Sequence, residues 1–322
     1  MKNVKKLLIF AAISTFVFAS STRTDALGGA GFWADDYANI WSFPAAVNDH
    51  NVAYTNGSNF TTIMNSDGTT WGFQGGTGDD VANVMWGNGS MGVTFGLSMT
   101  PEVTADDATA TNPEAEAVTD YDLGFGMPLA GGDFGFTYNS DGEIGINHRR
   151  AQSVWLWDNM LINFDMTPED FADGATQASD MNLGVSCYTV RTYDGGTSAL
   201  FGLGFAYGAN GASTDGGDAP DATMGIEWNF AVESEMTDWA TLRVGYSHGY
   251  DFATGGTDVA DVEGTDADEQ VNGFTLGLGF NYGSFDLDMS VGTTEILNDP
   301  VKYLAGRNTT PLGAGWTISY NW

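Results

Sequence analysis

The sequence has few basic residues, few prolines, one cysteine and no long apolar run. Its 322 residues include 10 Lys and Arg against 42 Asp and Glu, which gives a formal net charge of −32. This charge excludes nucleic acid and anionic lipid surfaces as partners, because both require clustered basic residues. The single cysteine, Cys187, excludes an internal disulfide framework and a cysteine-based metal site. No segment approaches the ~18 apolar residues of a membrane-spanning helix.

The first 19 residues have the pattern of a secretory signal peptide. Lys2, Lys5 and Lys6 precede an apolar run over 7–19, which ends in the small residue Ala19. A basic start, a short apolar run and a small residue at its end are the features that signal peptidase requires. We therefore predict an exported protein with residues 1–19 removed.

Alternating apolar and small polar residues recur along the rest of the chain. In the last seven residues, Trp316, Ile318, Tyr320 and Trp322 are separated by single polar residues. Neighbouring side chains of a strand point to opposite faces, so each such segment has one apolar and one polar face. The same alternation occurs in 91–99, 121–127, 134–138, 181–187, 201–207, 224–232, 242–246, 274–282 and 285–291, and less regularly in 52–54, 59–64, 71–74, 81–86 and 143–147.

Two all-β folds fit this pattern, a soluble sandwich and a transmembrane barrel. The polar face carries Gly, Ser, Thr, Asn and Asp with almost no Lys, whereas solvated sheets and exposed edges usually carry Lys. The segments are also about nine to eleven residues long, as tilted membrane strands require. We therefore predict a single antiparallel transmembrane barrel of about 14 strands (12–16) over 51–322, with long polar connections at 101–118, 209–221 and 252–269.

Two regions do not alternate. Residues 151–179 are not predicted to form a strand pair, and Thr167-Pro168-Glu169-Asp170 is typical of the start of a short helix in a long loop. Residues 20–50 are predicted to form an N-terminal plug or hatch. Its candidate residues are the glycines that permit tight turns, an acidic pair that can cap a short helix, and a proline: Gly28, Gly29, Gly31, Asp35, Asp36 and Pro44.

The N-terminal segment resembles the signature of the long-chain fatty-acid transporter superfamily of outer-membrane barrels, which includes PorV. The resemblance is carried by Leu27-Gly28-Gly29-Ala30-Gly31, the pair Asp35-Asp36, and Pro44-Ala45. It departs from the family at Phe43, where those proteins have Asn. The resemblance implies a segment tucked into a ~14-stranded barrel. An ordinary N-terminal segment without a transport role remains an equal alternative.

Strand parity places several ionisable residues inside the predicted barrel. Asp122, Glu227, Asp286 and Asp288 alternate with apolar neighbours, as does Arg243. Charges on the lipid face cost ~2–4 kcal/mol at the midplane, so inward placement is favoured. A carboxylate-lined lumen attracts cations, which predicts a cation-preferring pore. The alternative is that these carboxylates only solvate the interior or pair with arginines.

The sequence contains no recognisable catalytic motif, and we predict neither enzyme activity nor a cofactor. Its three histidines, His50, His148 and His248, are scattered. Acidic runs in the predicted loops, such as 258–269, are candidate Ca²⁺ or Mg²⁺ sites that could bridge to lipopolysaccharide; solvated charge is the alternative.

The closing strand resembles that of bacterial outer-membrane barrels, which ends on an aromatic residue. In that family the barrel-assembly machinery reads the terminal strand, which here assigns that role to Tyr320 and Trp322. The sequence thus predicts a porin-like channel for small solutes in the outer membrane of a diderm bacterium. A transporter of hydrophobic compounds and a non-conducting structural or secretion-partner barrel are the alternatives.

Overall fold

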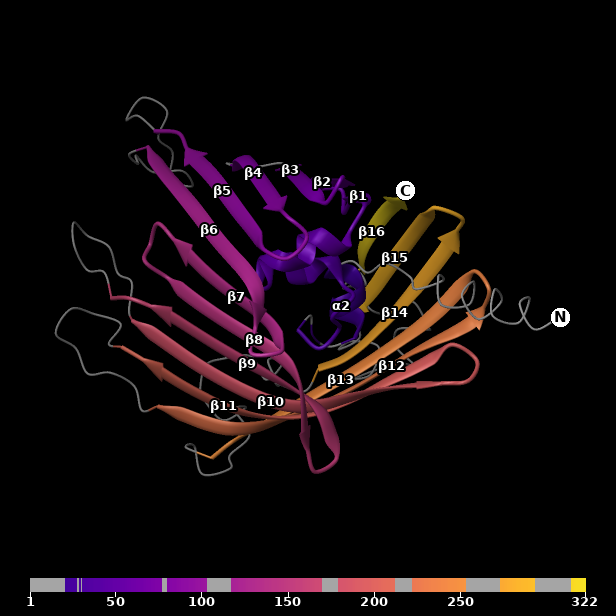
Figure 1. The fold of residues 1–322 in the computed structure, drawn as a ribbon. Coiled ribbons are helices and arrows are strands. Elements are labelled where there is room, and N and C mark those ends of the chain that lie inside the picture. The colour runs from indigo at the N-terminus through magenta and orange to yellow at the C-terminus, as the bar shows by residue number, and fades with distance from the viewer. Residues whose placement is uncertain are drawn as a thin grey trace, which may run out of the picture.

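The chain forms one closed antiparallel β-barrel in a computed structural model (Figure 1). The structure describes residues 21–27, 29, 31–76, 80–102, 117–169, 179–211, 222–252, 273–292 and 314–322. Each strand pairs with its sequence neighbours, and β1 closes the barrel by pairing with β16. Closure leaves no unpaired sheet edge, which a lipid environment requires because it offers the backbone no hydrogen-bond partners.

The 16 strands have the following bounds: β1 Val52–Thr55, β2 Asn59–Ser66, β3 Thr69–Gly76, β4 Asp80–Gly87, β5 Gly92–Thr100, β6 Val118–Leu129, β7 Gly132–Asn139, β8 Ile144–Val154, β9 Trp157–Thr167, β10 Asp180–Tyr193, β11 Thr197–Asn210, β12 Thr223–Thr237, β13 Ala240–Asp251, β14 Gly273–Tyr282, β15 Phe285–Gly292 and β16 Ala314–Asn321. One end of the barrel carries tight turns, such as Asp67–Gly68 between β2 and β3. The other end carries the longer connections.

The alternation of side chains sorts apolar groups to the outside of the barrel and polar groups to the inside. On β16, Trp316, Ile318 and Tyr320 are exposed, whereas Thr317 and Ser319 are buried in the interior. Strand β12 repeats this pattern with the same parity along its middle. An apolar outer face around a polar interior is the reverse of a soluble protein and is the arrangement of a barrel in lipid.

Residues 21–50 lie inside the ring of strands, where Figure 1 shows them in indigo. They form the helix α2 (Ser21–Ala26) and two 3-10 helices, η1 (Tyr37–Trp41) and η2 (Pro44–Asp49). Helix α2 contacts β13–β16, and η2 contacts β3–β7. We call residues 21–50 the inner segment. Within the described ranges, no helix has the length and apolar character needed to span a bilayer.

Glycines on the wall make room for the inner segment. A Cβ atom on Gly92 would overlap the carbonyl of Pro44, and one on Gly135 would overlap that of Ser42. The backbone at Ser42 and Pro44 therefore approaches strands β7 and β5 more closely than any side chain would allow.

The prediction of about 14 strands with a plug is wrong. The barrel has 16 strands, and the described part of residues 21–50 forms only short helical turns and no plug helix. The region 151–179, expected to lack a strand pair, contains the end of β8 and all of β9. Alternation is hidden there because the apolar Leu161 of β9 faces the interior, where it packs in a buried cluster with Leu27 and Phe43. The helix expected after Thr167 falls mainly on residues 170–178, outside the described residues.

Candidate functional site

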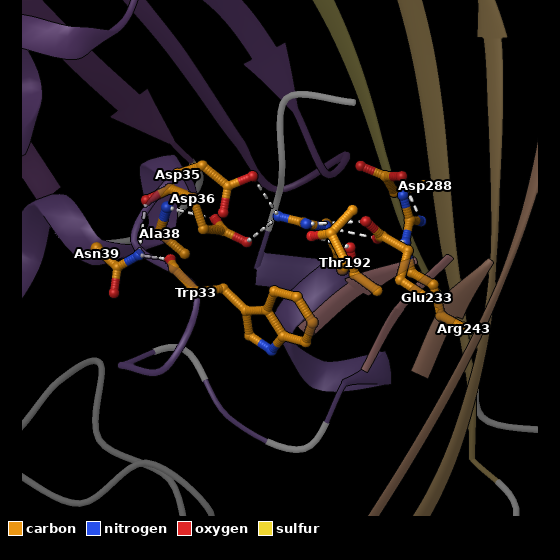
Figure 2. A network of polar contacts seen from close by, with 11 residues as sticks. Trp33, Asp35, Asp36, Ala38, Asn39, Thr192, Glu233, Arg243 and Asp288 are labelled. Atoms are coloured by element: carbon orange, nitrogen blue, oxygen red, sulfur yellow. Dashed lines mark hydrogen bonds and ion pairs between the residues drawn. The ribbon is translucent and has the colours of Figure 1, made fainter. Parts of the chain in front are cut away.

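A network of ion pairs joins the inner segment to the barrel wall. Figure 2 shows Asp35 and Asp36 on one side of it, and Glu233, Arg243 and Asp288 on the other. The acidic pair precedes η1, whereas the last three residues lie on β12, β13 and β15. The network therefore connects segments about 200 residues apart in the sequence.

Arg23 is the link between the two sides. Its Nε and Nη2 atoms donate to the two carboxylate oxygens of Glu233 at 2.7 and 2.9 Å. Its Nη1 lies 3.5 Å from Asp35, and its guanidinium lies 5.3 Å from the centre of the Trp33 ring. The bidentate geometry is the strong form of an arginine–carboxylate pair. Burial alone would lower the pKa of Arg23, but attraction to Glu233 and Asp35 outweighs it and raises that pKa above its ordinary value.

Glu233 also pairs with a second arginine, which is fully buried. Arg243 donates from Nε to Glu233 at 2.7 Å and from Nη1 to Asp288 at 2.6 Å. The side chains of Arg243 and Asp288 are 0% and 1% exposed. A buried charge of this kind is tolerated only when it is paired, so removal of one partner costs far more than the net worth of the pair.

Asp36 both caps η1 and faces Arg23. Its Oδ1 accepts a hydrogen bond from the Ala38 backbone at 2.8 Å, whereas its Oδ2 lies 3.8 Å from Arg23 Nη1, too far for a hydrogen bond. Burial raises the pKa of Asp36 to about 8, and the attraction of Arg23 only partly opposes this effect. The hydrogen-bonded partners of the two buried arginines are therefore Glu233 and Asp288.

A third arginine, Arg149, contacts a different part of the inner segment. Arg149 on β8 donates to Asp133 Oδ2 at 3.0 Å and to the Gly31 carbonyl at 3.0 Å. Its guanidinium also lies over the Phe43 ring, 4.6 Å from the centroid. Arginine contacts thus attach the inner segment both to β8 and to β12.

An acidic cavity of about 420 Å³ lies inside the barrel against β4 to β9. Asp122, Glu143 and Asp165 line it, together with Trp41 from the inner segment. The described lining contains no Lys, Arg or His. This part of the interior consequently carries net negative charge.

The structure places the five predicted pore residues in four different environments. Asp122 lines the acidic cavity, and Glu227 lines a second cavity beside the inner segment. Arg243 and Asp288 pair with each other, as the alternative interpretation allowed. Asp286 is buried and accepts hydrogen bonds from the side-chain amides of Asn281 and Asn321, at 2.6 and 2.7 Å. That these residues line a conducting pore stays a prediction.

Sequence reasoning missed Glu233 and Arg23, the centre of the network. Glu227 and Glu233 are an even number of positions apart on β12, so their side chains point to the same face. This spacing could have identified Glu233 as inward-facing. Nothing in the sequence pairs it with Arg23, because the two are 210 positions apart.

Most of the candidate residues predicted in 20–50 lie inside the barrel. Asp36 is the cap of η1, and Pro44 is the first residue of η2. Gly29 has a φ of +154°, and Gly31 lies against Leu161 of β9. Asp35 is exposed and faces Arg23. Gly28 lies outside the described residues.

The predicted assembly signal lies at the end of β16. Tyr320 and Trp322 are exposed, and their ring centroids are 5.9 Å apart. Their recognition by assembly machinery stays a prediction. Of the described His, Cys, Asp and Glu residues, no three are placed to hold a metal ion; the acidic run at 258–269 lies outside the described residues.

Comparison with known proteins adds little beyond the fold. No family model and no curated protein matches the chain. An anion-selective porin from Comamonas acidovorans is similar in structure, with 12% identity and a TM-score of 0.41, over 84% of this chain and 96% of that one. A mutant porin from Rh. blastica has 13% identity and a TM-score of 0.36, over 82% and 89%. Likenesses this distant do not establish a function. The resemblance to fatty-acid transporters has no support among them.

Proposed function

We propose that the protein is an outer-membrane channel for small hydrophilic solutes and that it prefers cations. The observation that carries the proposal is the acidic cavity, which lies within a closed barrel and has three carboxylates and no basic residue in its described lining. Barrels of 16 strands are wide enough to hold water in their interior. The apolar outer face supports a location in the outer membrane of a diderm bacterium, where lipid and lipopolysaccharide would surround it.

The charges inside the barrel support the preference for cations. The arginines of the network are matched by Glu233 and Asp288, and Arg149 is matched by Asp133. These pairs leave the carboxylates of the acidic cavity as a local excess of negative charge. A narrow space with such an excess concentrates cations and repels anions.

Reversal potentials in planar bilayers test this proposal. Under a salt gradient, we expect a potential of the sign that cation flow produces. The double variant D122N/D165N removes two charges from the acidic cavity and should move the reversal potential toward zero. Asp238→Asn, in the exposed turn between β12 and β13, removes one charge elsewhere and should leave it unchanged. Anion preference, or no conductance from a folded barrel, would refute the proposal.

The alternative of hydrophobic-compound transport finds less support. It requires an apolar internal cavity, whereas three carboxylates, Asp122, Glu143 and Asp165, share the lining of the acidic cavity with its apolar groups. The alternative of a non-conducting barrel is distinguished from our proposal by the same bilayer measurement.

A further inference from the structure

A second cavity lies between the inner segment and strands β9 to β12, with a volume of about 280 Å³. The inner segment contributes the rings of Phe32 and Phe43. The wall contributes polar side chains from three strands, namely Asn163 of β9, Ser186 of β10, and Glu227 and Asn229 of β12. We call this space the amide cavity. It has a different wall from the acidic cavity.

The polar groups of the amide cavity present mainly hydrogen-bond acceptors. Asn229 Nδ2 donates to Glu227 Oε1 at 3.2 Å, and Asn163 Nδ2 donates to Asn147 Oδ1 at 2.6 Å. Asn229 is only 4% exposed, and its Oδ1 has no hydrogen-bond partner among the described residues. A buried acceptor without a donor is unfavourable, and a ligand that supplies one would relieve the cost.

Glycines provide the space for such a ligand. Ser186 pairs with Gly204, which in turn pairs with Glu227, so a residue without a side chain lies between the two polar groups. A Cβ atom on Gly204 would lie 2.7 Å from Ser186 Oγ. Gly184 likewise leaves the wall beside Asn163 open.

The charge and the aromatic rings select the kind of ligand. Glu227 is the one carboxylate in the described lining, and no Lys, Arg or His accompanies it. The Phe32 ring lines the cavity as well, whereas one face of the Phe43 ring is occupied by the guanidinium of Arg149. An ammonium group offers three donors and no acceptor, which matches the carboxylate, the amide oxygens and the electron-rich ring faces.

We propose that the amide cavity binds a small organic ammonium ion, with its N–H groups directed to Glu227 and Asn229. A neutral alcohol of the same length would make only uncharged hydrogen bonds to the same acceptors. A carboxylate would be repelled by Glu227. Binding at this site does not require the barrel to conduct.

The test uses three solutes of equal length: 4-amino-1-butanol, 1,4-butanediol and 4-hydroxybutyrate. Binding to the full protein folded in detergent is measured by ligand-observed NMR titration. We expect the amine to bind about tenfold more tightly than the diol, since hydrogen bonds to charged groups are about twice as strong as neutral ones. The hydroxy acid should not bind. Equal binding of amine and diol, or no binding of either, overturns the proposal.

Variants assign the binding to this cavity. Glu227→Gln keeps the shape of the side chain and should remove the tenfold preference for the amine. Asp238→Asn is the matched control, because it removes one charge in the exposed turn that follows the same strand. A preference that survives Glu227→Gln in a folded barrel would place the amine elsewhere and overturn the assignment. Amine binding without any conductance would contradict the channel proposal while leaving this one intact.

Discussion

Replacing Glu233 by Gln tests the role of the ion-pair network most directly. The substitution keeps the side-chain size but leaves Arg23 and Arg243, which are 3% and 0% exposed, facing a neutral amide. Removing one partner from a buried ion pair costs about 3–5 kcal/mol. Arg243 keeps Asp288, and Arg23 keeps its longer contacts to Asp35 and Asp36. The cost should therefore fall mainly on the docking of the inner segment.

Hydrogen exchange followed by mass spectrometry measures this docking locally. If opening of the inner segment becomes easier by about 3–5 kcal/mol, amides of residues 21–50 should exchange roughly 100-fold to several thousand-fold faster. Amides in β12 should change much less, because the sheet ladder is intact.

Glu235→Gln is the control for this experiment. Glu235 lies two positions further along β12 but is exposed, and loss of an exposed charge changes stability by less than about 1 kcal/mol. If Glu233→Gln raised exchange of the inner segment no more than Glu235→Gln does, the network would not anchor that segment and our reading of its energetics would be refuted.

Further predictions concern pH, packing, the outer face and assembly. Burial lowers the pKa of His50 to about 4, so the neutral form of His50 is favoured in the folded state. Docking of the inner segment should therefore weaken by at most about 3 kcal/mol as pH falls from about 6.5 to 4. His50→Gln should abolish this pH dependence of hydrogen exchange. Gly92→Ala, which would collide with Pro44, should accelerate exchange of η2, whereas Gly75→Ala, with nothing within 4 Å, should not. Phe230→Lys on the outer face should lower the free energy of unfolding in urea by about 2–4 kcal/mol, and inward-facing Asn182→Lys should cost less. Tyr320→Ser with Trp322→Ser should reduce the heat-modifiable folded form in membranes without loss of total protein; unchanged assembly would contradict the predicted signal.

The sequence was sufficient to predict the barrel because most strands meet lipid on one face and water on the other. Strand β12 illustrates this, since its outer face carries Trp228 and Phe230 and its inner face carries Glu227 and Asn229. The strand prediction was wrong where the inner segment packs against the wall, because the inner face of the strand is then apolar as well. On β9, Leu161 is inward and apolar because it packs against Leu27 and Phe43, so the strand loses its alternation.

The site was less predictable than the fold. Parity can show that a carboxylate points inward, as for Asp122 and Asp288, but it cannot show what that carboxylate meets across the lumen. The pairing of Glu233 with Arg23 depends on how residues 21–27 fold back against β12, which is a contact between distant parts of the chain. The short helix capped by Asp36 was predicted, because capping is a local interaction between neighbours in sequence.

The first strand of the barrel has a mechanical consequence. At four residues, β1 is the shortest strand, whereas β10 and β11 have 14 each. The seam on either side of β1 therefore has the fewest backbone hydrogen bonds in the wall. The inner segment contacts β13–β16 through α2 and β3–β7 through η2, on the two sides of that seam. It acts as an internal brace, so a force or a denaturant that opens the barrel at β1 must also detach the inner segment from the wall on one side of the seam.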